Sequence, residues 1–76
     1  MFRAIVFQGG ERFSAMAETK QEAADKASSA CWLSYSGEPL GKDQHAVLQE
    51  DGRGATIVMD PDGTASFGVV LEIPNG

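Results

Sequence analysis

Hydrophobic and other β-forming residues predominate in residues 2–8 and 11–18, on the two sides of Gly9-Gly10. Two such segments around a two-residue glycine loop predict a β-hairpin of residues 2–8 and 11–18. The loop length fixes the register, in which Gln8 pairs with Glu11. One face of the hairpin then carries an apolar set: Phe2, Ala4, Val6, Phe13, Ala15 and Ala17.

A helical pattern follows in the segment TKQEAADKASSACWLS. Thr19 and Glu22 have capping-box spacing, which predicts a helix over residues 20–33. Trp32 lies away from the apolar stripe of this helix, so either the helix unwinds there and Trp32 closes the end of the core, or Trp32 is exposed. The stripe consists of small side chains, which favours close packing on a sheet: Ala23, Ala24, Ala27, Ala30 and Cys31.

Two further turn signals divide the rest of the chain after a loop of residues 34–44. Asp51-Gly52 suits a type I′ turn, and Asp60-Pro61-Asp62-Gly63 suits a type I turn that ends in a left-handed glycine. These turns predict a meander with strands of about 45–50, 54–60 and 64–73.

The turns also predict strand registers that gather the apolar residues of the meander on one face. The predicted partners are Leu48 with Ala55, Ala46 with Ile57, Ile57 with Phe67, and Met59 with Ala65. The same face continues through Val69, Leu71 and Ile73. Because two independent turns agree on this face, the meander is the internally consistent interpretation.

The elements add up to a single α+β domain over residues 1–76, with β-β-α-β-β-β order. A single antiparallel sheet has one helix packed on one face, and the order in which the hairpin joins the meander stays open. With a single cysteine the chain forms no internal disulfide, and it has no apolar segment long enough for a secretory or membrane-spanning sequence, so we expect a cytoplasmic protein without membrane contact.

One helix cannot cover both sides of five strands, so the second face of the sheet is a candidate binding surface. Its residues are either β formers shielded by Arg3 and Arg12, or an apolar patch used for a partner or for self-association. On the predicted registers the patch contains Ile5, Phe7 and Met16 of the hairpin, beside Arg12, and Val47, Thr56, Val58, Ser66, Gly68 and Val70 of the meander. Trp32, near Tyr35 and Leu40, is either a second contact or the closure of the core at the helix end.

The net charge of −5 has its acidic excess in the second half of the chain. Direct nucleic-acid binding needs a basic surface, which is missing from this composition. Acidic residues at the predicted meander turns favour a basic protein partner instead: Glu50, Asp51, Asp60 and Asp62.

Few residues are candidates for catalysis or metal binding. We expect Cys31 to fill the core and His45, the only histidine, to lie on the surface, which gives neither a zinc site nor a Cys-His nucleophile. DPDG at 60–63 resembles the start of a calcium loop, but the ligands that should follow are replaced by an apolar strand. No catalytic, metal or cofactor residue is assigned, and we expect a protein that is not an enzyme.

In size, acidity and β-β-α layout the chain resembles small phage-encoded proteins, among them anti-CRISPR inhibitors. This resemblance rests on the hairpin and on ERFSAMAETKQEAADKA. It implies a stoichiometric inhibitor that binds a CRISPR effector subunit and covers, with acidic residues, the basic surface meant for nucleic acid. The alternative is a structural accessory protein that forms a homodimer through the uncovered sheet face.

The chain is also similar to ubiquitin-like proteins in its opening hairpin and helix, in GEP after the helix and in QEDGRG. That likeness implies a β-grasp topology. The chain ends in IPNG without the Gly-Gly tail that conjugation requires, so a conjugated modifier is not the favoured interpretation.

Overall fold

A computed structural model describes residues 1–50, 54–59 and 66–74, with the backbone alone considered at 54–59 and 66–67. Its elements follow the predicted order, and their bounds are β1 (Phe2–Gln8), β2 (Glu11–Ala17), α1 (Lys20–Ser36), β3 (Val47–Glu50), β4 (Gly54–Met59) and β5 (Ser66–Glu72). In the described part of the chain, no helix is long and apolar enough to span a membrane.

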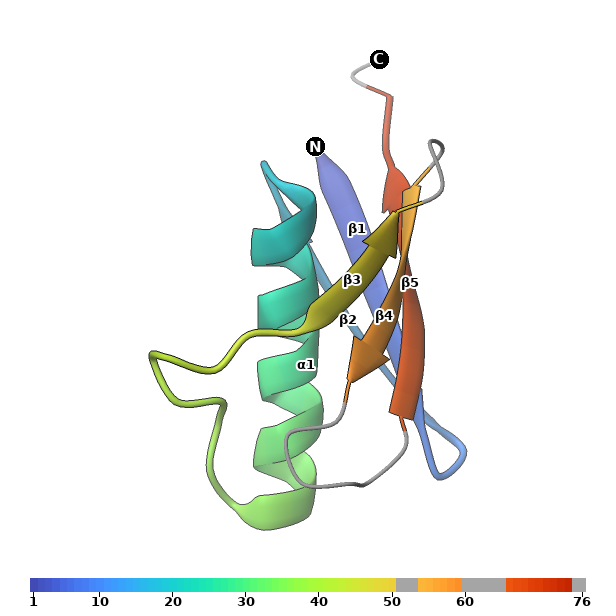
Figure 1. Cartoon of the computed structure of the whole chain (residues 1–76). Coiled ribbons are helices and arrows are strands. Elements are labelled where there is room, and N and C mark those ends of the chain that lie inside the picture. The colour runs from blue at the N-terminus through green and yellow to red at the C-terminus, as the bar shows by residue number, and fades with distance from the viewer. Residues whose placement is uncertain (51–53, 60–65, 75–76) are drawn as a thin grey trace.

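The five strands form one sheet in the order β2-β1-β5-β4-β3, and each neighbouring pair is antiparallel. Helix α1 lies on one side of this sheet (Figure 1). It packs mainly on β1 and β2. The predicted α+β class with a single antiparallel sheet and one helix on one face is therefore confirmed, and the hairpin joins the meander through β1 and β5.

The hairpin has the predicted register, with Gln8 opposite Glu11 and Phe2 opposite Ala17. Its two-residue turn places Gly9 at φ 55° and Gly10 at φ 84°, backbone angles that favour glycine. Because the register is fixed from the turn, the alternate residues of β1 enter the core together, and Val6 is fully buried.

Helix α1 begins where the sequence predicts. The Oγ1 atom of Thr19 accepts a hydrogen bond from the Glu22 amide at 3.1 Å. The helix continues three residues past its predicted end, to Ser36, because Gly37 is the residue that takes the left-handed conformation (φ 85°) and donates its N–H to the Leu33 carbonyl at 3.0 Å. Trp32 therefore lies within a regular helix and is half-buried.

The buried side of α1 is made of small residues, as predicted: Ala23, Ala24, Ala27, Ser28 and Cys31. Ala30, which the predicted stripe included, is exposed, and Ser28 takes its place. The side of the helix that faces the sheet is thus centred on Ala24, Ser28 and Cys31, which lie above one another along the helix. Small side chains allow the helix axis to approach β1 and β2 closely.

Both predicted registers of the meander are wrong, with different consequences. Leu48 pairs with Ile57 rather than Ala55, a shift of two residues that leaves each side chain on its predicted face. Ile57 pairs with Gly68 rather than Phe67, a shift of one residue that reverses β5. Val70 is fully buried, whereas Leu71 is 52% exposed.

The sequence predicted the wrong face of β5 because β5 is the central strand of the sheet. Its segment FGVVL is apolar at every residue but glycine, so alternation does not reveal which side faces the helix. Pairing with β1 decides instead, because Val70 lies opposite Ala4 and Gly68 opposite Val6. The turn residues 60–65, from which the register was predicted, lie outside the described residues.

Gly68 is a point of close approach between β5 and β1. A Cβ atom at this buried position would meet the Ile5 carbonyl oxygen and would lie 3.0 Å from the Val6 Cα. A glycine within a strand often marks such an approach of two backbones.

Replacing Gly68 by alanine is expected to lower the free energy of unfolding by about 1–3 kcal/mol, because the β1 backbone occupies the space that the new Cβ needs. Gly41→Ala is the control, since its Cβ would meet only the flexible Gln44 side chain, with Oε1 at 3.2 Å. Urea unfolding followed by Trp32 fluorescence measures both variants. Equal losses of stability would contradict the close approach at Gly68.

The two neighbouring serines of α1 are expected to respond in opposite ways to alanine. The Ser28 hydroxyl is buried without a hydrogen-bond partner in the described part of the chain, so Ser28→Ala should raise the free energy of unfolding by about 1 kcal/mol. The Ser29 hydroxyl accepts a hydrogen bond from the Leu40 amide at 3.1 Å, so Ser29→Ala should lower it. Thermal unfolding followed by circular dichroism tests the pair, and a loss of stability in Ser28→Ala would refute the first expectation.

Candidate functional site

The side of the sheet away from α1 is the larger candidate site, and we call it the open sheet face. None of the described elements covers it (Figure 1). Strand alternation and the observed registers assign ten described residues to it: Arg3, Ile5, Phe7, Arg12, Ser14, Met16, Val47, Gln49, Val69 and Leu71.

Four of the partner-binding residues predicted from the sequence lie together on the open sheet face. Ile5, Phe7, Arg12 and Met16 come from β1 and β2, where Phe7 is opposite Arg12. The observed register of β5 removes Gly68 and Val70 from this face, since both are buried on the helix side, and brings in Val69 and Leu71.

The remaining predicted contacts lie elsewhere. Trp32 is on the helix side of the sheet, and Glu50 makes an ion pair with Lys20 at 3.4 Å. Asp51, Asp60 and Asp62 lie outside the described residues. Of the acidic candidates the structure describes only Glu50, which lies in β3, at the edge of the sheet opposite β2.

In the described part of the chain, charge is distributed unevenly between the two sides of the sheet. Among the described residues, the open sheet face carries Arg3 and Arg12 and no acidic side chain. The Arg3 guanidinium reaches the Met16 sulfur at 3.7 Å, which places a cationic group at the edge of the apolar surface. The face is apolar with two positive groups, although the chain as a whole is acidic.

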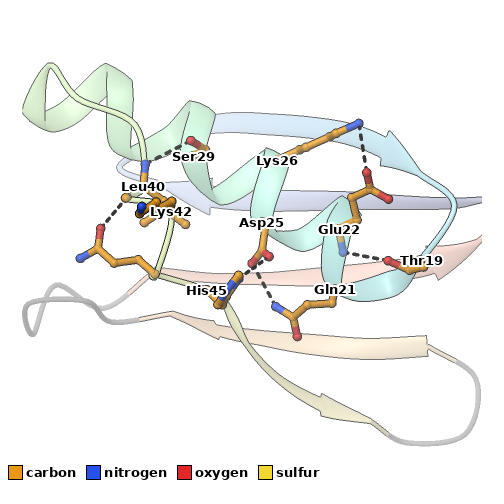
Figure 2. A pocket seen from close by; sticks show the side chains of 11 residues that line it. Thr19, Gln21, Glu22, Asp25, Lys26, Ser29, Leu40, Lys42 and His45 are labelled. Carbon is orange, nitrogen blue, oxygen red and sulfur yellow. Dashed lines mark hydrogen bonds and ion pairs between the residues drawn. The ribbon is translucent and has the colours of Figure 1, made fainter.

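A second candidate site is an open groove of about 450 Å³ between α1 and the segment that leads into β3. Among the residues that line it, the Asp25 carboxylate accepts three hydrogen bonds, as Figure 2 shows in part. The donors are the Ala46 amide at 2.8 Å, the Gln21 side chain at 3.0 Å and, with the proton on that ring nitrogen, His45 Nδ1 at 2.8 Å.

Gln21 completes the attachment of the strand to the helix. Its Nε2 also donates to the Ala46 carbonyl at 2.8 Å, so both polar groups of one residue's backbone are bonded by two helix side chains. Gln21 and Asp25 are four residues apart and share one side of α1. The arrangement fastens the chain at the entrance of β3, where Ala46 is buried.

The groove contains the Asp25-His45 pair, and the question is whether a nucleophile or a metal site accompanies it. Cys31 is buried in the core, as predicted, and burial raises the pKa of its thiol, with a smaller contribution from the negative charge of Glu11. The Ser29 hydroxyl, which also lines the groove, accepts a hydrogen bond from the Leu40 amide. Within residues 1–50, 54–59 and 66–74, no three His, Cys, Asp or Glu side chains gather as a metal site. The hydrogen bonds of Asp25 therefore indicate a structural role, in which the helix holds the start of β3 in place.

Comparison of the chain with protein-family models, with curated proteins and with solved structures gave no match. The two candidate sites are therefore judged on their geometry and charge.

Replacing Asp25 by alanine is expected to lower the free energy of unfolding by about 1–3 kcal/mol, because the partly buried Ala46 amide loses its acceptor. His45→Ala removes only the exposed hydrogen bond to Asp25 and should change the free energy of unfolding by less than about 0.5 kcal/mol. Urea unfolding measures both, and amide hydrogen exchange at Ala46 should accelerate in Asp25→Ala alone. Equal effects in the two variants would contradict the proposed attachment.

Proposed function

We propose that the protein is a non-enzymatic protein-binding module that docks its partner on the open sheet face. The observation that carries this proposal is the register of β5, which adds Val69 and Leu71 to the apolar residues of the hairpin. A contiguous apolar surface on a small globular domain is typical of an interaction site.

The chemistry of the face favours a partner with an apolar surface and acidic groups beside it. Arg3 and Arg12 lie among apolar side chains, and arginine next to aromatic residues is enriched at the centres of interfaces. A second copy docked face to face would bring the same two positive residues and, among the described residues, no acidic group to meet them. Charge complementarity therefore favours a different protein over a face-to-face homodimer.

This partner differs from the basic one that the acidic turns predict. A basic partner needs Glu50, which is paired with Lys20, and the aspartates outside the described residues. Inhibition of a nucleic-acid-handling protein, such as a CRISPR effector subunit, is one specific case of the proposal. Its support is the size, acidity and layout of the chain.

Two exposed leucines provide a matched test. Leu71 on the open sheet face is 52% exposed, and Leu33 near the end of α1 is 50% exposed. Replacing either by glutamate introduces the same charge at similar exposure. A partner captured from the native host and then purified should bind Leu71→Glu at least about tenfold more weakly than the unchanged chain, a loss of about 1.4 kcal/mol. Leu33→Glu should bind within about twofold.

Isothermal titration of the purified partner measures these affinities. Phe7→Ala/Arg12→Glu serves as a second variant of the face and should also lose binding. Affinity that falls with Leu33→Glu, or that is unchanged by Leu71→Glu, would exclude the open sheet face as the docking surface. Circular dichroism of each variant verifies that the fold is retained.

A further inference from the structure

Strand β2 forms one edge of the sheet, and its backbone offers a row of polar groups to the outside. In a hairpin with a two-residue turn, the residues that flank the turn exchange both hydrogen bonds, and such pairs then alternate along the strands. Because Gln8 and Glu11 flank the turn, the N–H and C=O groups of Phe13 and Ala15 point toward β1. The same groups of Arg12, Ser14 and Met16 point away from the sheet.

The two edges of the sheet differ in how they are protected. β3 has four residues, and the Ala46 backbone just before it is bonded by helix side chains. β2 has seven residues and pairs with β1 without a bulge; it contains neither proline nor lysine, and its charged residues are confined to its first two positions, Glu11 and Arg12. Sheet edges in monomeric proteins usually carry such protective features. β2 therefore has the properties of a strand that pairs with another.

The sequence of β2 is complementary to itself in one antiparallel register. Centred on Ser14, a second copy of β2 places Arg12 opposite Met16, so the three outward-facing residues pair only with one another and exchange about six hydrogen bonds. Glu11 lies opposite Ala17 of the second copy, so no like charges meet. An arginine beside Met16 already occurs within the chain, where Arg3 lies opposite it in β1.

We propose that two copies of the chain pair through β2, in antiparallel register about Ser14, to form one continuous sheet of ten strands. The two-fold axis of such a pair is perpendicular to the sheet, so both helices lie on one side and both open sheet faces lie on the other. The open sheet faces then form one surface that extends across the dimer. This inference rests on the edge of β2 and does not require the partner proposed above.

The core gives a reason for the chain to associate. Among the residues whose side chains the structure describes, the largest that are fully buried are Val6, Val70 and Ser28. Small domains with limited cores are commonly stabilised by association.

Ser14→Pro tests the proposal most directly. Proline at this position removes an N–H that points to the outside and leaves the hydrogen bonds between β1 and β2 in place. Size-exclusion chromatography with light scattering should give twice the chain mass for the unchanged protein and the chain mass for Ser14→Pro. Ser14→Lys, which places two positive charges opposite each other on the two-fold axis, should weaken the dimer at least about tenfold and should recover at high salt.

Gln49→Lys is the matched control, because it adds the same charge to the open sheet face at the opposite edge and should leave the dimer intact. If Ser14→Pro does not fold, as judged by circular dichroism, Ser14→Lys and Gln49→Lys still decide the question. An unchanged protein that is monomeric up to about 1 mM would overturn the proposal. A dimer that persists in Ser14→Lys would also overturn the proposal. So would a dimer that dissociates in Leu71→Glu but not in the Ser14 variants.

Discussion

The pairing of β5 with β1 determines which side chains of the sheet meet the helix. Ala4 lies opposite Val70 and Val6 opposite Gly68, so Gly68 and Val70 of β5 face α1. The glycine lets the two backbones come together, and Val70 fills part of the space under the alanine side of the helix. Val69 and Leu71 of β5 are left on the other side of the sheet. The buried core and the open sheet face are thus two results of one register.

Local signals in the sequence were sufficient for the hairpin and the start of the helix. Gly9 and Gly10 fix a two-residue turn, and this turn alone sets all the pairs between β1 and β2. Thr19 fixes the first turn of α1 through its own hydroxyl. These features depend on residues close in sequence, which is why they could be predicted. The end of the helix was missed because Gly37, the residue that supplies the left-handed cap, lies four residues beyond the predicted end at residue 33.

Contacts between distant segments explain what the sequence could not reveal. The face of β5 depends on β1, roughly sixty residues away, and an unbroken apolar segment has no alternation to indicate it. Gly68 was the available signal, because a glycine inside a strand marks a close backbone approach. Four residues of the open sheet face, Ile5, Phe7, Arg12 and Met16, followed from the hairpin. The attachment of Ala46 by Asp25 joins residues about twenty positions apart through an irregular segment, and no pattern announces it.

That attachment has a consequence for how copies of the chain can assemble. Gln21 and Asp25 act on Ala46 as a neighbouring strand would, by bonding its carbonyl and its amide. The sheet therefore has one edge, β3, that is short and fastened at its entrance, and one longer edge, β2, whose outer side none of the other described strands pairs with. A sheet with two unprotected edges can add strands from further copies and grow into a fibre. With β3 at both outer ends, a pair joined through β2 presents no long edge to a third copy, and growth stops at two.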